Sequence, residues 1–215
     1  MMKLLKTIMV LLVGASIIMA KNYLGAELYS KESVKYGRFE IRMRMVYGNG
    51  ILSTFFLYYD NSWKGSPEPW REIDLEVLGK NNTGFQSNII TGNSGSQTHS
   101  DKFHSFNVKL NEGYHTYAIE WTPDYIAWFF DSKEVRRATG QQVIECREKM
   151  QSYRFNLWIT SNSNWAGAFN PSVLPVYQYI NWVKYSSYTP GQGPNGSNFT
   201  FAWQDNFDRF DSQRW

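Results

Sequence analysis

The stretch Glu72-Ile73-Asp74-Leu75-Glu76-Val77 places three carboxylates at every second position, with branched apolar residues between them. Side chains alternate between the two faces of a β-strand, so the acids share one face and the apolar residues share the other. Alternating acids are also typical of the solvated face of an edge strand. Here Trp70 precedes the run and Leu78 ends it, so both flanks are apolar. We therefore predict a central strand whose acidic face lines a cleft.

Three acids on one face would influence each other's protonation. Like charges held this close raise one another's pKa, so at least one acid should keep its proton near neutral pH while another is ionised. Cleavage of a glycosidic bond needs that division, between a proton donor to the leaving oxygen and a carboxylate that faces the anomeric carbon. An extended strand puts the Cα atoms of Glu72 and Glu76 about 13 Å apart. Strand curvature and inward-leaning side chains can bring their carboxyl groups to the ~5–5.5 Å of an enzyme that retains anomeric configuration.

The N-terminus combines a basic start with an uncharged stretch from Thr7 to Ala20. This pattern is typical of a secretory signal peptide cleaved after Ala20, and the stretch is shorter than the roughly 20 apolar residues of a membrane span. We therefore expect residues 1–20 to be a signal peptide and residues 21–215 to form a single catalytic domain. The expected location is secreted and extracellular, without a membrane partner.

Composition narrows the class of partner. The chain has 22 Lys and Arg against 19 Asp and Glu, and no basic patch that indicates nucleic-acid binding. The single cysteine, Cys146, excludes an internal disulfide. Aromatic residues make up 17% of the chain and include nine tryptophans, a supply that suits a cleft in which sugar rings stack on aromatic rings. We expect a neutral carbohydrate substrate, no nucleic acid, and a monomer.

Period-two patterning dominates the rest of the sequence and predicts many strands. Thr122-Pro123-Asp124 is typical of a hairpin turn between two of them. Only Gln141–Tyr153 has a pattern compatible with a helix. Many strands, frequent turns and almost no helix predict an all-β fold, an antiparallel β-sandwich. The expected strands are Arg38–Met45, Ile51–Tyr59, Trp70–Gly79, Gly84–Ile90, Tyr117–Trp121, Tyr125–Phe130, Phe155–Thr160 and Tyr179–Tyr185.

The sequence gives little support to dinucleotide binding or to a histidine metal site. Gly191, Gly193 and Gly196 match a dinucleotide-binding fingerprint literally, but Pro194 lies inside the match and no helix follows, so residues 190–197 are interpreted as a flexible surface linker. The three histidines lack metal-binding spacing.

With the acid strand in place, the chain resembles glycoside hydrolase family 16, the β-jelly-roll endoglucanases, and within it the 1,3-1,4-β-glucanases (lichenases). The motif Glu-x-Asp-x-Glu is the catalytic signature of that family. Supporting matches extend along nearly the whole mature chain. They are Gly25–Tyr29, Tyr36–Glu40, Phe85–Ile90, His115–Tyr117, Glu120–Pro123 and Arg154–Trp158. The resemblance implies a concanavalin-like jelly roll.

The order of the segments differs from that of most of the family. The stretch Asp205–Trp215 matches a family segment that usually lies near the start of the mature enzyme, yet here it is the C-terminus. The linker at 190–197 falls where the original ends would be joined. The chain thus resembles circularly permuted 1,3-1,4-β-glucanases of rumen bacteria. Relatives continue beyond the tryptophan that matches Trp215, so we expect a chain truncated at its C-terminus relative to the family.

Carried over position by position, the resemblance implies Glu72 as the nucleophile, Glu76 as the general acid/base and Asp74 as the helper that tunes both. It implies no cofactor for catalysis, and a structural calcium whose ligand positions include Asn181 and Asn206. The residues expected to line the sugar subsites are Phe56, Tyr58, Gln86, Asn88, Asn156, Trp158 and Trp165.

The function implied is that of an endo-β-glucanase that retains anomeric configuration and cuts β-1,4 bonds next to β-1,3 bonds in mixed-linkage β-glucan. An endo-1,3-β-glucanase or a transglycosylase of the same fold is an alternative, because cleft loops decide linkage preference. A non-catalytic carbohydrate-binding jelly roll is another. The three crowded acids argue against it, since a protein that only binds has no use for them.

Overall fold

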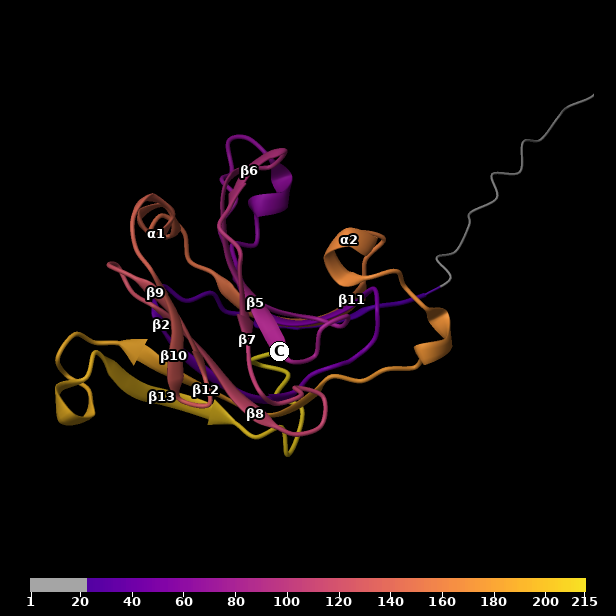
Figure 1. Ribbon diagram of the computed structural model, residues 1–215. Helices are drawn as coiled ribbons and strands as arrows, with labels where there is room; N and C mark the ends of the chain where they lie inside the picture. The colour runs from indigo at the N-terminus through magenta and orange to yellow at the C-terminus, as the bar shows by residue number, and fades with distance from the viewer. Residues whose placement is uncertain (1–22) are drawn as a thin grey trace, which may run out of the picture.

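Two antiparallel β-sheets make up most of the chain in the computed structural model, which describes residues 23–215 (Figure 1). The strands are β1 (Ala26–Tyr29), β2 (Gly37–Arg44), β3 (Ile51–Tyr58), β4 (Glu72–Leu78), β5 (Gly84–Asn93), β6 (Ser96–His99), β7 (Lys102–Ser105), β8 (His115–Trp121), β9 (Ile126–Phe130), β10 (Lys133–Ala138), β11 (Ser152–Ile159), β12 (Tyr179–Tyr188) and β13 (Phe199–Asp205). The helices are α1 (Gln141–Cys146) and α2 (Ser163–Ala166), with short 3₁₀ helices at Ser62–Lys64, Pro171–Val173 and Pro194–Gly196. The predicted signal peptide, residues 1–20, lies outside the described residues.

The two sheets form a sandwich, which confirms the predicted fold class. One sheet has the strand order β1-β11-β3-β4-β5-β6, with β7 also paired to β5, and the other has the order β10-β9-β8-β2-β12-β13. In Figure 1 the sheet with β5 and β11 lies above the sheet with β12 and β13, and the β5–β6 hairpin and α2 rise above the upper sheet. The inner faces are joined by aromatic packing, as between Phe39 of β2 and Phe55 of β3, whose ring centroids are 5.9 Å apart.

Strand β4 is central, as the flanks of its acidic run predict. It pairs with β3 on one side and β5 on the other, and Ile73, Leu75 and Val77 are fully buried between the sheets. Burial of alternate apolar residues fixes the register, because a slip of one residue would drive the acids into the core. The opposite face of β4, with its three acids, therefore points out of the sandwich.

The predicted helix over Gln141–Tyr153 is wrong in its second half. Helix α1 ends at Cys146, and β11 begins at Ser152. Tyr153 and Phe155 are buried in the core, and the segment pairs with β3 along its whole length. Sheet pairing thus overrides the local helical pattern. The hairpin predicted at 122–124 is confirmed, since the backbone N–H of Thr122 donates to the carbonyl of Tyr125 at 2.9 Å.

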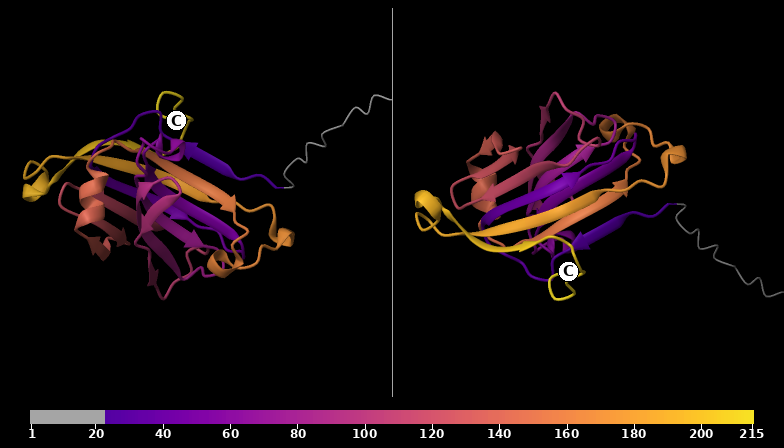
Figure 2. Two further views of the ribbon diagram at one scale, coloured as in Figure 1. Left: turned by 90° about the horizontal axis from the view of Figure 1, so that it is seen from above. Right: turned by 90° about the horizontal axis from the view of Figure 1, so that it is seen from below.

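The predicted linker at 190–197 connects β12 and β13, which pair as an antiparallel hairpin. Figure 2 shows this connection projecting beyond the sheets. The N–H of Thr189 donates to the carbonyl of Asn198 at 2.8 Å, and the N–H of Gly191 donates to Oδ1 of the same residue at 3.1 Å. Circular permutation stays a prediction. Within residues 23–215 no helix is long and apolar enough to cross a membrane.

Candidate active site

Cross-strand pairing puts several predicted sugar-binding residues on the same face as the acids. Glu72 lies opposite Tyr58 of β3. Asp74 lies between Phe56 of β3 and Asn88 of β5. Directly opposed residues of an antiparallel pair point to the same face of the sheet. Phe56 is only 8% exposed, so its ring supports the floor of the cleft and does not present an open stacking surface.

The row that contains Glu76 extends further across the sheet. Glu76 lies opposite Gln86 on one side and Thr54 on the other, and Thr54 lies opposite Asn156 of β11. The hydroxyl of Thr54 donates to Oδ1 of Asn156. The indole N–H of Trp165, in α2, donates to Oε1 of Gln86 at 3.1 Å. Gln86 and Trp165 therefore lie beside Glu76, and Asn156 lies in the same row on the far side of Thr54.

Trp158 belongs to the same face and joins the wall formed by α2. It lies opposite Leu52, its ring centroid is 5.9 Å from that of Trp165, and both indoles pack against a small cluster of Leu52, Leu78 and Ala166. Both tryptophans are half-buried. They are thus fixed in place while part of each ring stays accessible, which is what a sugar-stacking wall needs.

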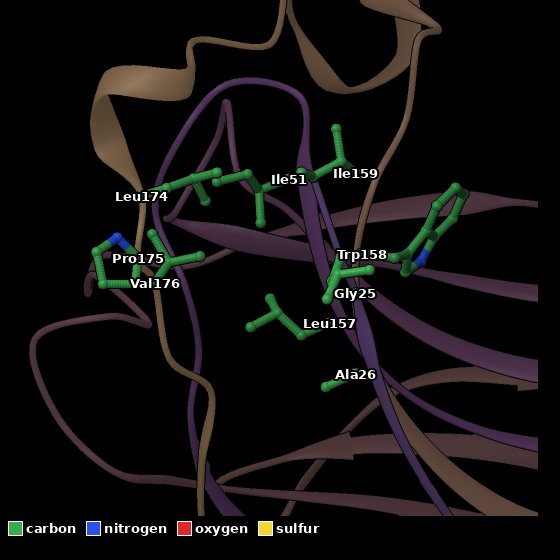
Figure 3. Close-up of a pocket in the computed structure, with 10 residues that line it drawn as sticks. Gly25, Ala26, Ile51, Leu157, Trp158, Ile159, Leu174, Pro175 and Val176 are labelled. Atoms are coloured by element: carbon green, nitrogen blue, oxygen red, sulfur yellow. The ribbon is translucent and has the colours of Figure 1, made fainter. Parts of the chain in front are cut away.

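A cavity of about 380 Å³ opens beside the proposed acid. Its lining is Glu76, Gln86, Asn88, Ile90, His99, Asp101, Asn162 and Trp165. A separate, apolar pocket lies under the edge of the sheet, and Figure 3 shows Leu157 directed into it and the indole of Trp158 directed away. That pocket has no acid in its lining, and alternation along β11 separates it from the acid face.

Burial raises the pKa of all three acids, but their hydrogen bonds differ. Burial raises the pKa of Glu72, whereas hydrogen bonds from Trp70 and Asp74 lower it. The Trp70 Nε1 atom lies 2.7 Å from Oε2 of Glu72. Burial and the charges of Glu72 and Glu76 hold the pKa of Asp74 well above its ordinary value. The net shift of the Glu72 pKa is upward, but Glu72 is the acid that receives hydrogen bonds from Trp70 and Asp74 and faces the positive charge of Arg154, all of which favour its ionised form.

Glu76 holds the second proton. Burial, followed by the charges of Glu72 and Asp101, raises its pKa to about 8. At neutral pH the row thus contains a protonated Glu76, and on the same wall of the cleft Glu72 is the acid whose ionised form has hydrogen-bond donors and a positive charge to favour it. This is the division of protonation states that glycosidic bond cleavage requires.

Three further residues, Trp70, Arg154 and Asp101, belong to the site but were not predicted from the motif. Trp70 stands two residues before Glu72, so the alternation of side chains along a strand could have predicted that it lies on the acid face. Arg154 likewise stands two residues before Asn156 on β11, and its positive charge lowers the pKa of Glu72.

Arg154 is held in place by two carboxylates, one on β1 and one in the connection after β3. It forms ion pairs with Glu27 at 2.7 Å and Asp60 at 2.8 Å, and its guanidinium lies 5.0 Å from the ring centroid of Tyr58. Asp101 is different, because it comes from the connection between β6 and β7 and reaches the site only through the fold. No local pattern marks it.

The two residues expected to bind calcium lie on or beside the β12–β13 pair. Asn181 is on β12, and Asn206 follows the last paired residue of β13. Both are exposed, and Oδ1 of Asn206 already accepts a hydrogen bond from Gln204 at 2.7 Å. Amide oxygens suit calcium, but a site takes six to eight oxygens. No cluster of three or more His, Cys, Asp or Glu among residues 23–215 could hold a metal. Calcium stays a prediction, and no step below depends on it.

A jelly-roll sandwich with a row of acids and aromatic walls on one outer face is typical of proteins that act on polysaccharides. The chain belongs to glycosyl hydrolases family 16, whose sequence pattern matches residues 7–184. The family predicted from the acid motif and its supporting segments is therefore confirmed.

Curated relatives agree with this assignment. A β-glucanase from Fibrobacter succinogenes is 50% identical over 198 residues, which cover 92% of this chain and 56% of that protein. A β-glucanase from Brevibacillus brevis is 33% identical over 168 residues, which cover 78% of this chain and 62% of that protein. The chain therefore spans less than two thirds of the length of these relatives.

Solved structures share the fold. The β-glucanase of Bacillus licheniformis superposes with a TM-score of 0.63 at 31% identity, over 74% of this chain and 70% of that one. The laminarinase catalytic domain of Thermotoga maritima superposes with a TM-score of 0.60 at 20% identity, over 75% of this chain and 67% of that one. The second likeness shows the fold alone.

Proposed function

We propose that the protein is a secreted endo-β-1,3-1,4-glucanase that hydrolyses β-1,4 bonds next to β-1,3 bonds in mixed-linkage β-glucan. The observation that carries this proposal is the acid row on β4, in which Glu72, Asp74 and Glu76 lie on one face and the pKa of Glu76 is raised to about 8. The β-glucanase relatives support the substrate class, and the 50% identity to one of them is the strongest support. Secretion rests on the sequence pattern of residues 1–20.

In the first step, the carboxylate of Glu72 attacks the anomeric carbon while the bond from that carbon to the leaving oxygen breaks. Glu76 gives its proton to that oxygen, so the leaving sugar departs as a neutral alcohol. The glycosyl unit is then an ester of Glu72. Hydrogen bonds from Trp70 and Asp74 stabilise Glu72 as a carboxylate and orient it for attack.

In the second step, the charge of Glu72 is gone because it has become an ester. That charge is one of the causes of the high pKa of Glu76, so its loss lowers this pKa and leaves Glu76 ready to act as a base. Glu76 takes a proton from water, the water oxygen attacks the anomeric carbon, and the bond to Glu72 breaks. Two inversions give overall retention.

The experiment compares initial rates of reducing-sugar release from barley mixed-linkage glucan, laminarin, xyloglucan and carboxymethylcellulose. We expect the mixed-linkage glucan to be cut much faster than the others, and the first-formed sugar to have retained configuration by NMR. Equal or faster hydrolysis of laminarin would assign the protein to the endo-1,3-β-glucanases. Sugar binding without release from any polymer would assign it to the non-catalytic jelly rolls, and an inverted first product would refute the role of Glu72.

A further inference from the structure

A side chain of the opposite sheet is bonded to the backbone of the middle acid. Trp128, on β9, is fully buried, and its indole N–H donates to the backbone carbonyl of Asp74 at 2.8 Å. The carboxyl of Asp74 points into the cleft, so this bond reaches the same residue from the core side. Glu72 and Glu76 lie two residues to either side. A shift of the backbone at Asp74 therefore changes the position of both.

Trp128 is itself held by a neighbour on β10. The guanidinium of Arg136 lies 4.7 Å from the Trp128 ring centroid, within the range of a cation–π interaction. Arg136 also donates to the carbonyl and to the hydroxyl of Ser87 at 3.0 Å each. Ser87 is on β5 and lies opposite Leu75 of β4. Trp128 thus attaches the second sheet to β4 at Asp74, and Arg136 attaches it to the neighbouring strand β5 at Ser87, which lies opposite the next residue of β4.

We propose that Trp128 is a positioning residue for glycoside hydrolysis, which fixes β4 at Asp74 so that the carboxyl groups of Glu72 and Glu76 keep the separation that double displacement needs. The inference rests on the proposed function of these two acids. Its physical basis is that misplacement of reacting groups by about 1 Å can cost about 100-fold in rate. A hydrogen bond from a rigid, buried indole restrains the strand more closely than apolar packing does, because its strength depends on direction as well as distance.

The chain offers a matched control for this idea. Trp121, on β8, is also fully buried, but its indole nitrogen has no hydrogen-bond partner within the described part of the chain. Trp121→Phe and Trp128→Phe remove the same atoms from the same core. Only the second removes a bond to β4. The difference between the two variants therefore measures the loss of that bond, together with any weakening of the contact between Arg136 and the ring.

The test measures kcat and KM on barley mixed-linkage glucan well below the melting temperature of each variant. For Trp128→Phe we expect kcat to fall by about tenfold or more at a KM within about twofold of the wild type, because orientation acts on the chemical step more than on substrate binding. For Trp121→Phe we expect both constants to stay within about twofold. Equal kcat values in the two folded variants would overturn the positioning role.

Should Trp128→Phe fail to fold, Arg136→Lys provides the second measurement. Lysine keeps the charge but loses the planar group that stacks on Trp128 and bonds Ser87. A fall in kcat of a few fold at unchanged KM supports the proposal, and an unchanged kcat overturns it. Wild-type activity separates the two levels of inference. An active wild type whose kcat survives the substitution overturns only the positioning role, whereas a wild type inactive on every glucan overturns the proposed function as well.

Discussion

Glu76→Gln tests whether the raised pKa of Glu76 lowers the stability of the folded protein at neutral pH. Burial, with the charges of Glu72 and Asp101, raises the pKa of Glu76 from its ordinary 4.5 to about 8. A carboxyl with a raised pKa in the folded state contributes stability that is complete below its unfolded pKa, and this contribution is lost as the pH rises through the folded pKa. The loss therefore develops between about pH 4.5 and about pH 8. Each pH unit within that window costs about 1.4 kcal/mol.

At about pH 7 the loss amounts to about 3 kcal/mol by this reasoning. Glutamine has the shape of a protonated glutamate and cannot ionise, so it escapes the loss. Since the three acids titrate together, we expect the free energy of unfolding of Glu76→Gln to exceed that of the wild type by about 2–3 kcal/mol at pH 7. For a chain of this size the gain corresponds to about 4–12 °C in melting temperature. Near pH 4.5 the two proteins should be almost equally stable.

Urea unfolding followed by tryptophan fluorescence across this pH range measures the effect. Glu112→Gln is the control, because Glu112 is an exposed acid in the connection before β8, where it pairs with Lys109. The control should show no gain that grows with pH. A gain for Glu76→Gln that is the same near pH 4.5 and near pH 8 would refute the argument, because it would show that the substitution acts through packing and not through the charge.

Further expectations concern the chemistry of the row. Glu72→Ala should abolish hydrolysis and be partly rescued by azide with formation of an α-glycosyl azide, because the small anion fills the vacated space; a β product or no rescue would contradict the nucleophile assignment. Trp70→Phe removes a hydrogen bond that lowers the pKa of Glu72, so the acid limb of the pH profile of kcat/KM should move to higher pH, and an unmoved limb would contradict that role. Asp101→Asn removes a charge that raises the pKa of Glu76, so the alkaline limb should move to lower pH by about 0.1–0.7, less at high salt, as expected for an exposed charge. Asp208→Asn, an exposed aspartate of the C-terminal segment, should leave both limbs in place.

Much of the site could be predicted from local sequence. Side chains of a strand alternate by geometry, so the spacing of Glu72, Asp74 and Glu76 is enough to place them on one face. Their apolar flanks indicate a central strand, because exposed edge strands are commonly protected by charged residues or proline. The same alternation assigns Trp70 to the acid face.

Tertiary structure decided the protonation states. The pKa of Glu76 depends on burial and on Asp101, which lies in a connection 25 residues further along the chain. The charge on Glu72 is favoured by Arg154, which β11 brings to the acid face through pairing with β3. No local pattern specifies which strands will be neighbours, because strand order depends on the packing of the whole sandwich.

The end of α1 shows the same division. The sequence from Gln141 is compatible with a helix through Tyr153, but α1 ends at Cys146, and pairing of β11 with β3 holds the residues from Ser152 on in a strand. Local propensity is worth a few tenths of a kcal/mol per residue, whereas burial of one aromatic side chain is worth about 2–3 kcal/mol. The sequence by itself therefore determined the strand of the acids, the face that carries them and the all-β class of the fold. Only the fold decided which strands are neighbours and which distant charges act on the acid row, because pairing and burial are properties of the whole chain.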